Sequence, residues 1–212
     1  MTMGPAPAGK LIRRQIALAP GSPLRGLAGA GGELWFMIAG SARLDVGALR
    51  GAAVRAGTGC WIPPRVEYRL DAVDDVRLDA VALPAGPGAE TVDQPRLSEL
   101  ADCDVERTGD RRFRVLLGPG RGCAAATQFV GEIPPGRAPE HSHPYDEVVL
   151  VLGGSGVAHT GAGDRALAPG TSVHLPRGLP HCLENTGQHT LTVLGVFHPG
   201  GSPAAKTTEV LR

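Results

Sequence analysis

Apolar residues occur along this chain in short runs, and Gly and Pro separate one run from the next. The 31 glycines and 19 prolines are spread through all 212 residues and mark many turns. The clearest runs predict strands in residues 11–20, 32–46, 111–120, 123–136 and 189–200. Alternation places Gln128 and Val130 on one face of a strand and Phe129 on the other, without indicating which face is internal. The pattern indicates an all-β protein.

The chain also repeats its own pattern at an offset of 113 or 114 residues. At this offset Glu33 falls on Glu147, and residues 57–68 fall on residues 170–181. A repeat of this kind indicates an internal duplication. We therefore predict a first domain, a linker, a second domain and a tail, in residues 10–84, 85–110, 111–200 and 201–212. Within the linker, residues 94–102 predict a short helix.

Composition removes several classes of function. Lys plus Arg and Asp plus Glu are both 21, so the net charge indicates neither nucleic acid nor an anionic membrane surface as a partner. No apolar run approaches the roughly 18 residues of a membrane span, and the first residues lack the apolar core of a signal peptide. The four cysteines form no C-x-x-C pair. We expect a cytoplasmic protein with reduced thiols.

Three histidines and a glutamate lie at spacings that a metal site needs. His141 and His143 are two residues apart, so on a strand both side chains project from one face, and Glu147 can return a carboxylate to that side. His181 would complete the set from a second strand. Such ligands suit Fe(II), Mn(II), Ni(II) or Zn(II), and an octahedral ion keeps two positions open for substrate, water or dioxygen. The alternative is that the pair is two half-exposed histidines on a strand.

These residues resemble the two signature motifs of the cupin superfamily. The first motif is present as His141, His143, Glu147 and Gly154, and the second as Gly170, Pro176, Gly178, His181 and Asn185. One departure is Pro135, which stands where the family usually has a glycine, with Gly136 beside it. The resemblance extends from about residue 11 to residue 198. It implies a bicupin of two tandem double-stranded β-helix (jelly-roll) barrels, with His141, His143, Glu147 and His181 as metal ligands, and it implies a homodimer.

The first copy lacks three of the four ligands. Leu27 and Gly29 stand in the places of the paired histidines, and Tyr68 stands in the place of His181, so that only Glu33 is kept. We expect no metal in this copy. It is either a scaffold, which we favour, or a second, metal-free binding site around Glu33 and Tyr68. Its aromatic residues are expected in the core or at an interface, namely Trp35, Phe36 and Trp61.

Two further residues are candidates for proton transfer, Tyr145 between the ligands and His174 on a strand of the second motif. With them, three functions are open. The favoured one is a non-haem Fe(II) oxygenase that binds a small molecule and dioxygen. The second is an isomerase, cyclase or decarboxylase that uses the metal as a Lewis acid. The third is a ligand-binding protein without turnover, because fold alone does not fix function.

Overall fold

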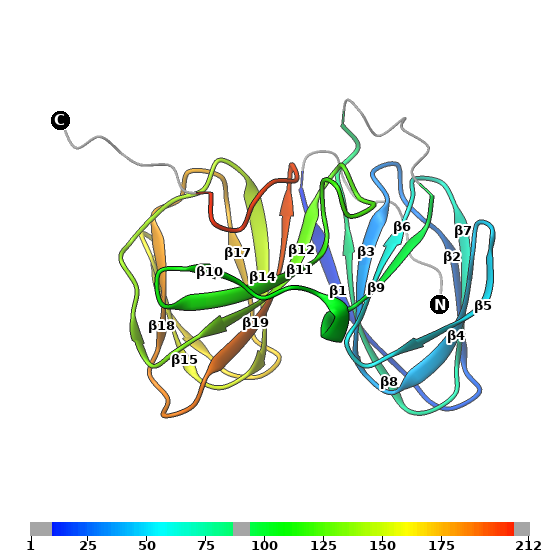
Figure 1. Cartoon of the computed structure of the whole chain (residues 1–212), viewed down its shortest axis with the longest axis horizontal. Helices are drawn as coiled ribbons and strands as arrows, with labels where there is room; N and C mark the ends of the chain where they lie inside the picture. Colours follow the sequence, from blue (N-terminus) through cyan, green and yellow to red (C-terminus); the bar gives the residue numbers. More distant parts are fainter. Residues whose placement is uncertain (1–9, 87–93, 206–212) are drawn as a thin grey trace.

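The computed structural model describes residues 10–86 and 94–205, and apart from one short 3-10 turn their regular elements are β-strands (Figure 1). This confirms the all-β prediction. The first half of the chain contains β1 (Ile12–Leu18), β2 (Pro23–Leu27), β3 (Glu33–Ala39), β4 (Ser41–Val46), β5 (Leu49–Arg55), β6 (Thr58–Ile62), β7 (Glu67–Ala72), β8 (Val76–Ala82) and β9 (Arg96–Glu99). None of the helices in the described ranges is long and apolar enough to cross a membrane.

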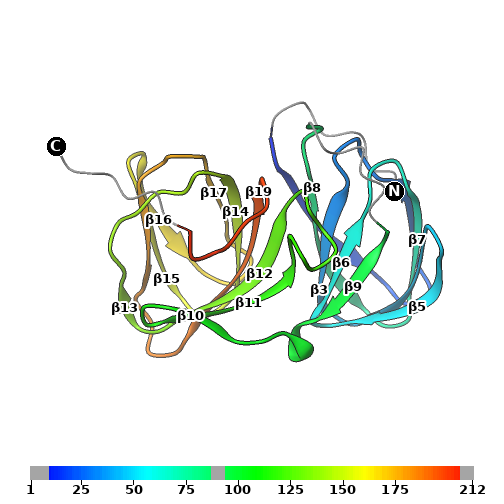
Figure 2. The same cartoon turned by 45° about the horizontal axis from the view of Figure 1, so that its top comes forward.

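The second half contains the remaining strands. They are β10 (Glu106–Thr108), β11 (Arg111–Leu117), β12 (Thr127–Ile133), β13 (Gly136–Arg137), β14 (Asp146–Gly153), β15 (Gly156–Thr160), β16 (Gly163–Leu167), β17 (Ser172–Leu175), β18 (His181–Asn185) and β19 (Leu191–His198). Each half folds into two antiparallel sheets that face one another (Figure 2). The described strand pairing gives four separate sheets, and it does not show two closed barrels.

The strand order is repeated between the halves. The order β1-β8-β3-β6 in the first half corresponds to β12-β19-β14-β17 in the second, and β2-β7-β4-β5 corresponds to β13-β18-β15-β16. The register is repeated as well, because Glu33 pairs with Ile62 on β6 and Glu147 pairs with Leu175 on β17. The sequence offset therefore reappears in three dimensions, as a duplicated chain requires.

Three hydrophobic cores explain why the central strands are apolar on both faces. One core fills the first half and one fills part of the second, while a third lies between the facing large sheets. On β3, Trp35 points into the first half, whereas Phe36 points toward the second. Trp61 joins Phe36 in the core between the halves. The prediction of core and interface aromatics is confirmed, and the two halves share one buried surface.

The linker and the tail are more structured than predicted. The predicted helix in residues 94–102 is wrong, because residues 96–99 form β9 on the edge of β6 and only residues 100–102 form a 3-10 turn. An exposed strand edge offers unpaired backbone groups, and β9 satisfies them. At the other end, the Thr127 hydroxyl donates to the carbonyl of Gly201 at 2.9 Å and accepts from its N–H at 3.0 Å.

Candidate metal centre

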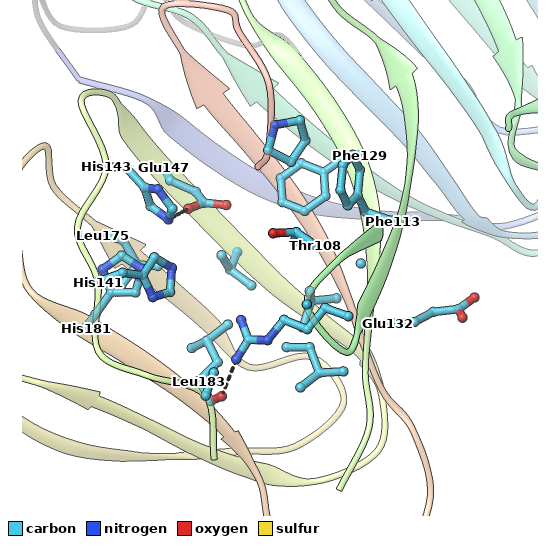
Figure 3. A pocket seen from close by; sticks show the side chains of 18 of the residues that line it. Thr108, Phe113, Phe129, Glu132, His141, His143, Glu147, Leu175, His181 and Leu183 are labelled. Carbon is cyan, nitrogen blue, oxygen red and sulfur yellow. Dashed lines mark hydrogen bonds and ion pairs between the residues drawn. The ribbon is translucent and has the colours of Figure 1, made fainter. Parts of the chain in front are cut away.

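A cavity of about 240 Å³ opens inside the second half (Figure 3). His141, His143 and His181 lie on one side of it and Phe113 and Phe129 across from them. Its walls are mainly apolar and include Ile133, Val149, Leu175, Leu183 and Val193. The face of β12 that carries Phe129 is therefore the internal one, while Gln128 and Val130 face the first half.

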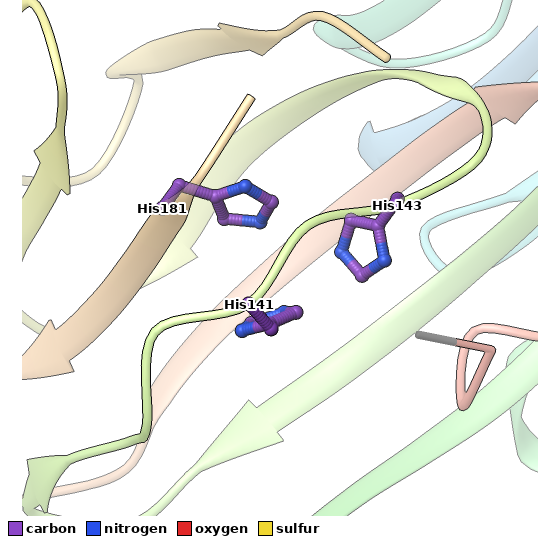
Figure 4. Close-up of side chains that lie close together, drawn as sticks. All are labelled: His141, His143 and His181. Carbon is purple, nitrogen blue, oxygen red and sulfur yellow. The ribbon is translucent and has the colours of Figure 1, made fainter. Parts of the chain in front are cut away.

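The three histidines come from two neighbouring segments of backbone. His141 and His181 form an isolated antiparallel bridge, in which each N–H donates to the other residue's carbonyl, at 3.0 and 2.9 Å. The ring centroids of His141, His143 and His181 lie 4.6 to 4.9 Å apart (Figure 4). Their potential ligand atoms all lie within 4.8 Å of one another. The structure thus brings His181 next to His141, which precedes it by forty positions in the sequence, and next to His143.

Hydrogen bonds to the backbone fix the tautomer of each ring. The Nδ1 atoms of His141, His143 and His181 lie 3.2, 3.1 and 2.8 Å from carbonyl oxygens, which belong to Pro139, Ala205 and Leu179. A carbonyl oxygen can only accept, so each Nδ1 must carry the proton. The lone pair of each imidazole is then on Nε2. In metal sites, a hydrogen bond from the other ring nitrogen fixes the orientation of a ligating histidine in the same way.

Glu147 lies next to this cluster on β14. Its Oε2 is 3.6 Å from the Nε2 of His143, and the residue is buried. Burial raises the pKa of Glu147 to about 8, and a bound cation would favour the ionised form. Gly195 on β19 leaves space for it, because a Cβ there would overlap the Phe129 ring and lie 3.0 Å from the Glu147 Oε1.

The donor set therefore fits a divalent metal ion. Burial lowers the pKa of His181, which keeps this imidazole neutral near pH 7. Three neutral imidazoles close together could hold one ion, and the buried carboxylate of Glu147 lies where it could add a negative charge. Its role as the fourth ligand stays a prediction.

The comparisons with known proteins agree with this arrangement. Residues 129–197 match the family model described as Cupin domain. This range runs from within β12 to within β19 and contains the three histidines and Glu147. No curated protein matches the chain.

Solved cupin structures match nearly the whole chain. A cupin 2 conserved barrel domain protein from Leptotrichia buccalis has a TM-score of 0.60 and 16% identity, with 91% of each chain covered. A mutant of Bacillus subtilis oxalate decarboxylase has a TM-score of 0.74 and 14% identity, covering 94% of this chain and 71% of that one. A second structure of that enzyme, described by its Mn(II) centres, has a TM-score of 0.73 at 14% identity and the same coverage. Similarity at this level shows the cupin fold alone.

The structure separates the two candidates for proton transfer. Tyr145 lines the cavity of the second half, and its ring stacks on His143 and on Phe197, with centroids 4.7 and 3.9 Å apart. Burial raises the pKa of Tyr145, so its hydroxyl stays protonated. His174 is exposed, and its Nε2 lies 3.6 Å from Asp146. The neighbouring Leu175 lines the cavity, and alternation turns His174 away from it.

In the first half, Leu27 and Tyr68 of the motif copy line an open pocket of about 860 Å³ together with Arg25 and Arg69, whereas Glu33 is buried and does not line it. The indole N–H of Trp35 donates to Glu33 at 2.8 Å, and the ring of Tyr68 packs edge-on against Trp35 at 4.6 Å. A space of only about 10 Å³ remains inside, beside Trp35 and Cys60, which is at the lower limit for one water molecule. Among the described residues, the three histidines of the second half are the only cluster of potential metal ligands. The scaffold interpretation of the first half stays a prediction.

Two contributors to the site were missed by sequence reasoning. The carbonyl of Ala205, which holds His143, belongs to residues that the sequence assigned to a tail. Arg111 at the start of β11 lines the cavity, and its Nη2 donates to the carbonyl of Leu183 at 2.9 Å. Strand alternation could have indicated that one of the adjacent Arg111 and Arg112 points inward, but not which one.

Proposed function

We propose that this protein is a metal-dependent enzyme that acts on a small organic molecule. His141, His143, His181 and Glu147 hold one divalent ion in this proposal, with Fe(II) favoured over Mn(II), Ni(II) and Zn(II). The observation that supports it most is the anchoring of three Nδ1 atoms by carbonyls, which leaves three Nε2 lone pairs close together. A bound Fe(II) would supply open coordination positions for substrate and dioxygen.

The residues of the cavity have two roles in this oxygenase function. The apolar wall, with Phe113 and Phe129 opposite the histidines, excludes water from the reacting groups. The ring of Tyr145 stacks on His143, and this contact and the backbone hydrogen bond together limit rotation of that imidazole. Both features keep the ligand set in one geometry before substrate arrives.

A second candidate function is Lewis-acid chemistry without dioxygen, such as isomerisation, cyclisation or decarboxylation. It is favoured by Tyr145, because a protonated hydroxyl at the cavity wall can donate a proton to a substrate oxygen. The similarity in fold to oxalate decarboxylase is compatible with it. His174 has no role in either proposal, since the structure places it outside the cavity.

The proposal gives the two halves different tasks. Residues 111–200 form the catalytic barrel, and residues 10–84 form a barrel without metal that supports it across the shared core. Residues 85–110 join them. Dimerisation is also a proposal, which light scattering would test.

Oxygen uptake tests the favoured function. The protein is loaded anaerobically with Fe(II) and mixed with a panel of enols, diketones and thiols, and oxygen consumption is recorded with product mass. Oxygen consumption that depends on one of these compounds supports the oxygenase. Turnover without oxygen, reduced in Tyr145→Phe, would instead support the second candidate. Binding of compounds with no turnover under any metal would contradict both and leave a ligand-binding protein.

A further inference from the structure

Adjacent arginines at the start of β11 have opposite environments. Arg112 is about half exposed, and its Nε pairs with Glu132 at 3.1 Å. Arg111 turns into the second half, where its Nη2 donates to the carbonyl of Leu183. Alternation along the strand produces this difference. A positive charge therefore faces a cavity whose walls are mainly apolar outside the histidine cluster.

The guanidinium of Arg111 lacks a counterion in the described part of the chain. No carboxylate of the described residues lies within ion-pairing distance of this guanidinium. Its hydrogen bond to Leu183 is to a neutral carbonyl. Burial lowers the pKa of Arg111, while Cys182 and the exposed Asp110 oppose this as lesser influences. A guanidinium has five N–H donors, so most of its hydrogen-bonding capacity remains for a ligand. Withdrawing even part of a charged group from water is costly unless the group is paired.

The summed charge of the whole site is positive, like the charge of Arg111. With a divalent ion and an ionised Glu147, the three neutral histidines leave one net positive charge, Arg111 adds a second, and Asp110 at the cavity wall offsets one of the two. Glu132 at the cavity wall does not cancel the other, because it already pairs with Arg112 and Arg114 at 3.1 and 3.3 Å. An anionic ligand would restore the balance.

The position of Arg111 also limits the shape of the ligand. Leu183, whose carbonyl holds the guanidinium, follows His181 by two residues on β18, so the two anchor points are roughly 6 to 7 Å apart along one strand. Figure 3 shows Leu183 below the histidines on the same side of the cavity. The volume of about 240 Å³ is smaller than the roughly 300 Å³ at which pockets for drug-sized ligands begin.

We propose that Arg111 binds the carboxylate of a small, otherwise apolar organic acid whose opposite end faces His141, His143 and His181. The orientation of that opposite end rests on the proposed function, whereas the carboxylate contact does not need a metal. Arg111 is then the specificity-determining residue that selects acids over neutral analogues, because a guanidinium and a carboxylate match in charge and in bidentate geometry.

The test compares acids with their neutral isosteres in protein freed of metal by a chelator. Butyrate, hexanoate and benzoate, and the matched amides, are titrated calorimetrically into the wild type, Arg111→Met, Arg111→Lys and Arg114→Met. We expect at least one acid to bind the wild type, and Arg111→Met to weaken it about ten- to hundredfold, the usual range for a charge-assisted hydrogen bond. Amide binding should change less than about twofold. Arg111→Lys should recover part of the loss.

Arg114→Met is the matched control, since it removes the same charge from the same strand at a residue that does not line the cavity. Three results would overturn the proposal: no acid binds the wild type, Arg111→Met binds acids as well as the wild type does, or both variants lose affinity equally. Thermal unfolding of each variant shows whether it is folded. Because metal is absent, these results are independent of activity: acid binding without catalysis leaves this inference standing, and catalysis without Arg111-dependent binding rejects it.

Discussion

The ion pair of Arg13 and Asp79 allows a quantitative test of how the two halves are held together. Arg13 Nε lies 2.6 Å from Asp79 Oδ1, and the two side chains are 8% and 0% exposed. Arg13 Nη1 also donates to the hydroxyl of Ser172 in the second half at 3.1 Å. Asp79 Oδ2 has no hydrogen-bond partner among the described residues, so Arg13 is the main group that compensates this buried carboxylate.

Replacing Arg13 with Met leaves the Asp79 carboxylate buried without compensation. Removing one partner of a buried pair typically costs about 3 to 5 kcal/mol, and we expect a loss of that order at pH 8. Urea unfolding, followed by the fluorescence of Trp35 and Trp61, measures it. In the double variant Arg13→Met, Asp79→Asn the buried charge is gone, so this variant should be more stable than Arg13→Met alone.

The loss should also depend on pH. Burial raises the pKa of Asp79, and Arg13 opposes that rise. Without Arg13 the folded-state pKa moves further above the unfolded value. A raised pKa of an acid means that the folded state binds the proton more tightly, so stability increases as pH falls through the folded-state pKa. The defect of Arg13→Met should therefore be smaller at pH 5 than at pH 8. A loss below about 1 kcal/mol at both pH values, or no recovery in the double variant, would refute this reasoning.

Two further predictions concern the second half. The added methyl group of Gly195→Ala should overlap the Phe129 ring and crowd Glu147, and so weaken zinc binding about ten- to hundredfold in a chelator competition. Gly153→Ala is the control, because a Cβ there meets nothing within 4 Å. Equal zinc affinities of the two variants would contradict the prediction. His159 lies 2.7 Å from Glu184 and 2.8 Å from Asp164, which raise its pKa, so its stabilising effect should be complete below about pH 6.5 and disappear as pH rises through the folded-state pKa. An NMR titration giving His159 a pKa of 6.5 or lower would exclude this.

Local sequence patterns were sufficient to predict the main strands. Alternation correctly separated Phe129 from Gln128, because side chains on a strand have a period of two. The meeting of His181 with His141 and His143 was predicted from the resemblance to the cupin motifs, because the first copy has none of these histidines. Motif spacing could not show that Arg111 faces the cavity, since residues 111 and 112 are both arginine.

Other features depended on contacts distant in sequence. Nothing in residues 96–99 indicates that the edge of β6 will take them as a strand, so local helix propensity gave a wrong prediction. The anchoring of His143 by Ala205 joins residues 62 positions apart. His174 points outward because of how β17 pairs with β14. The sequence of β17 alone does not specify this pairing.

Metal content is the most direct test of the proposed centre. The wild type, His181→Ala and His174→Ala are each loaded with Fe(II), Mn(II), Ni(II) or Zn(II), dialysed, and measured by plasma emission spectrometry, with circular dichroism to confirm folding. We predict about one ion per chain in the wild type and in His174→Ala, and little in a folded His181→Ala. No metal in the wild type, or equal content in all three proteins, would contradict the account.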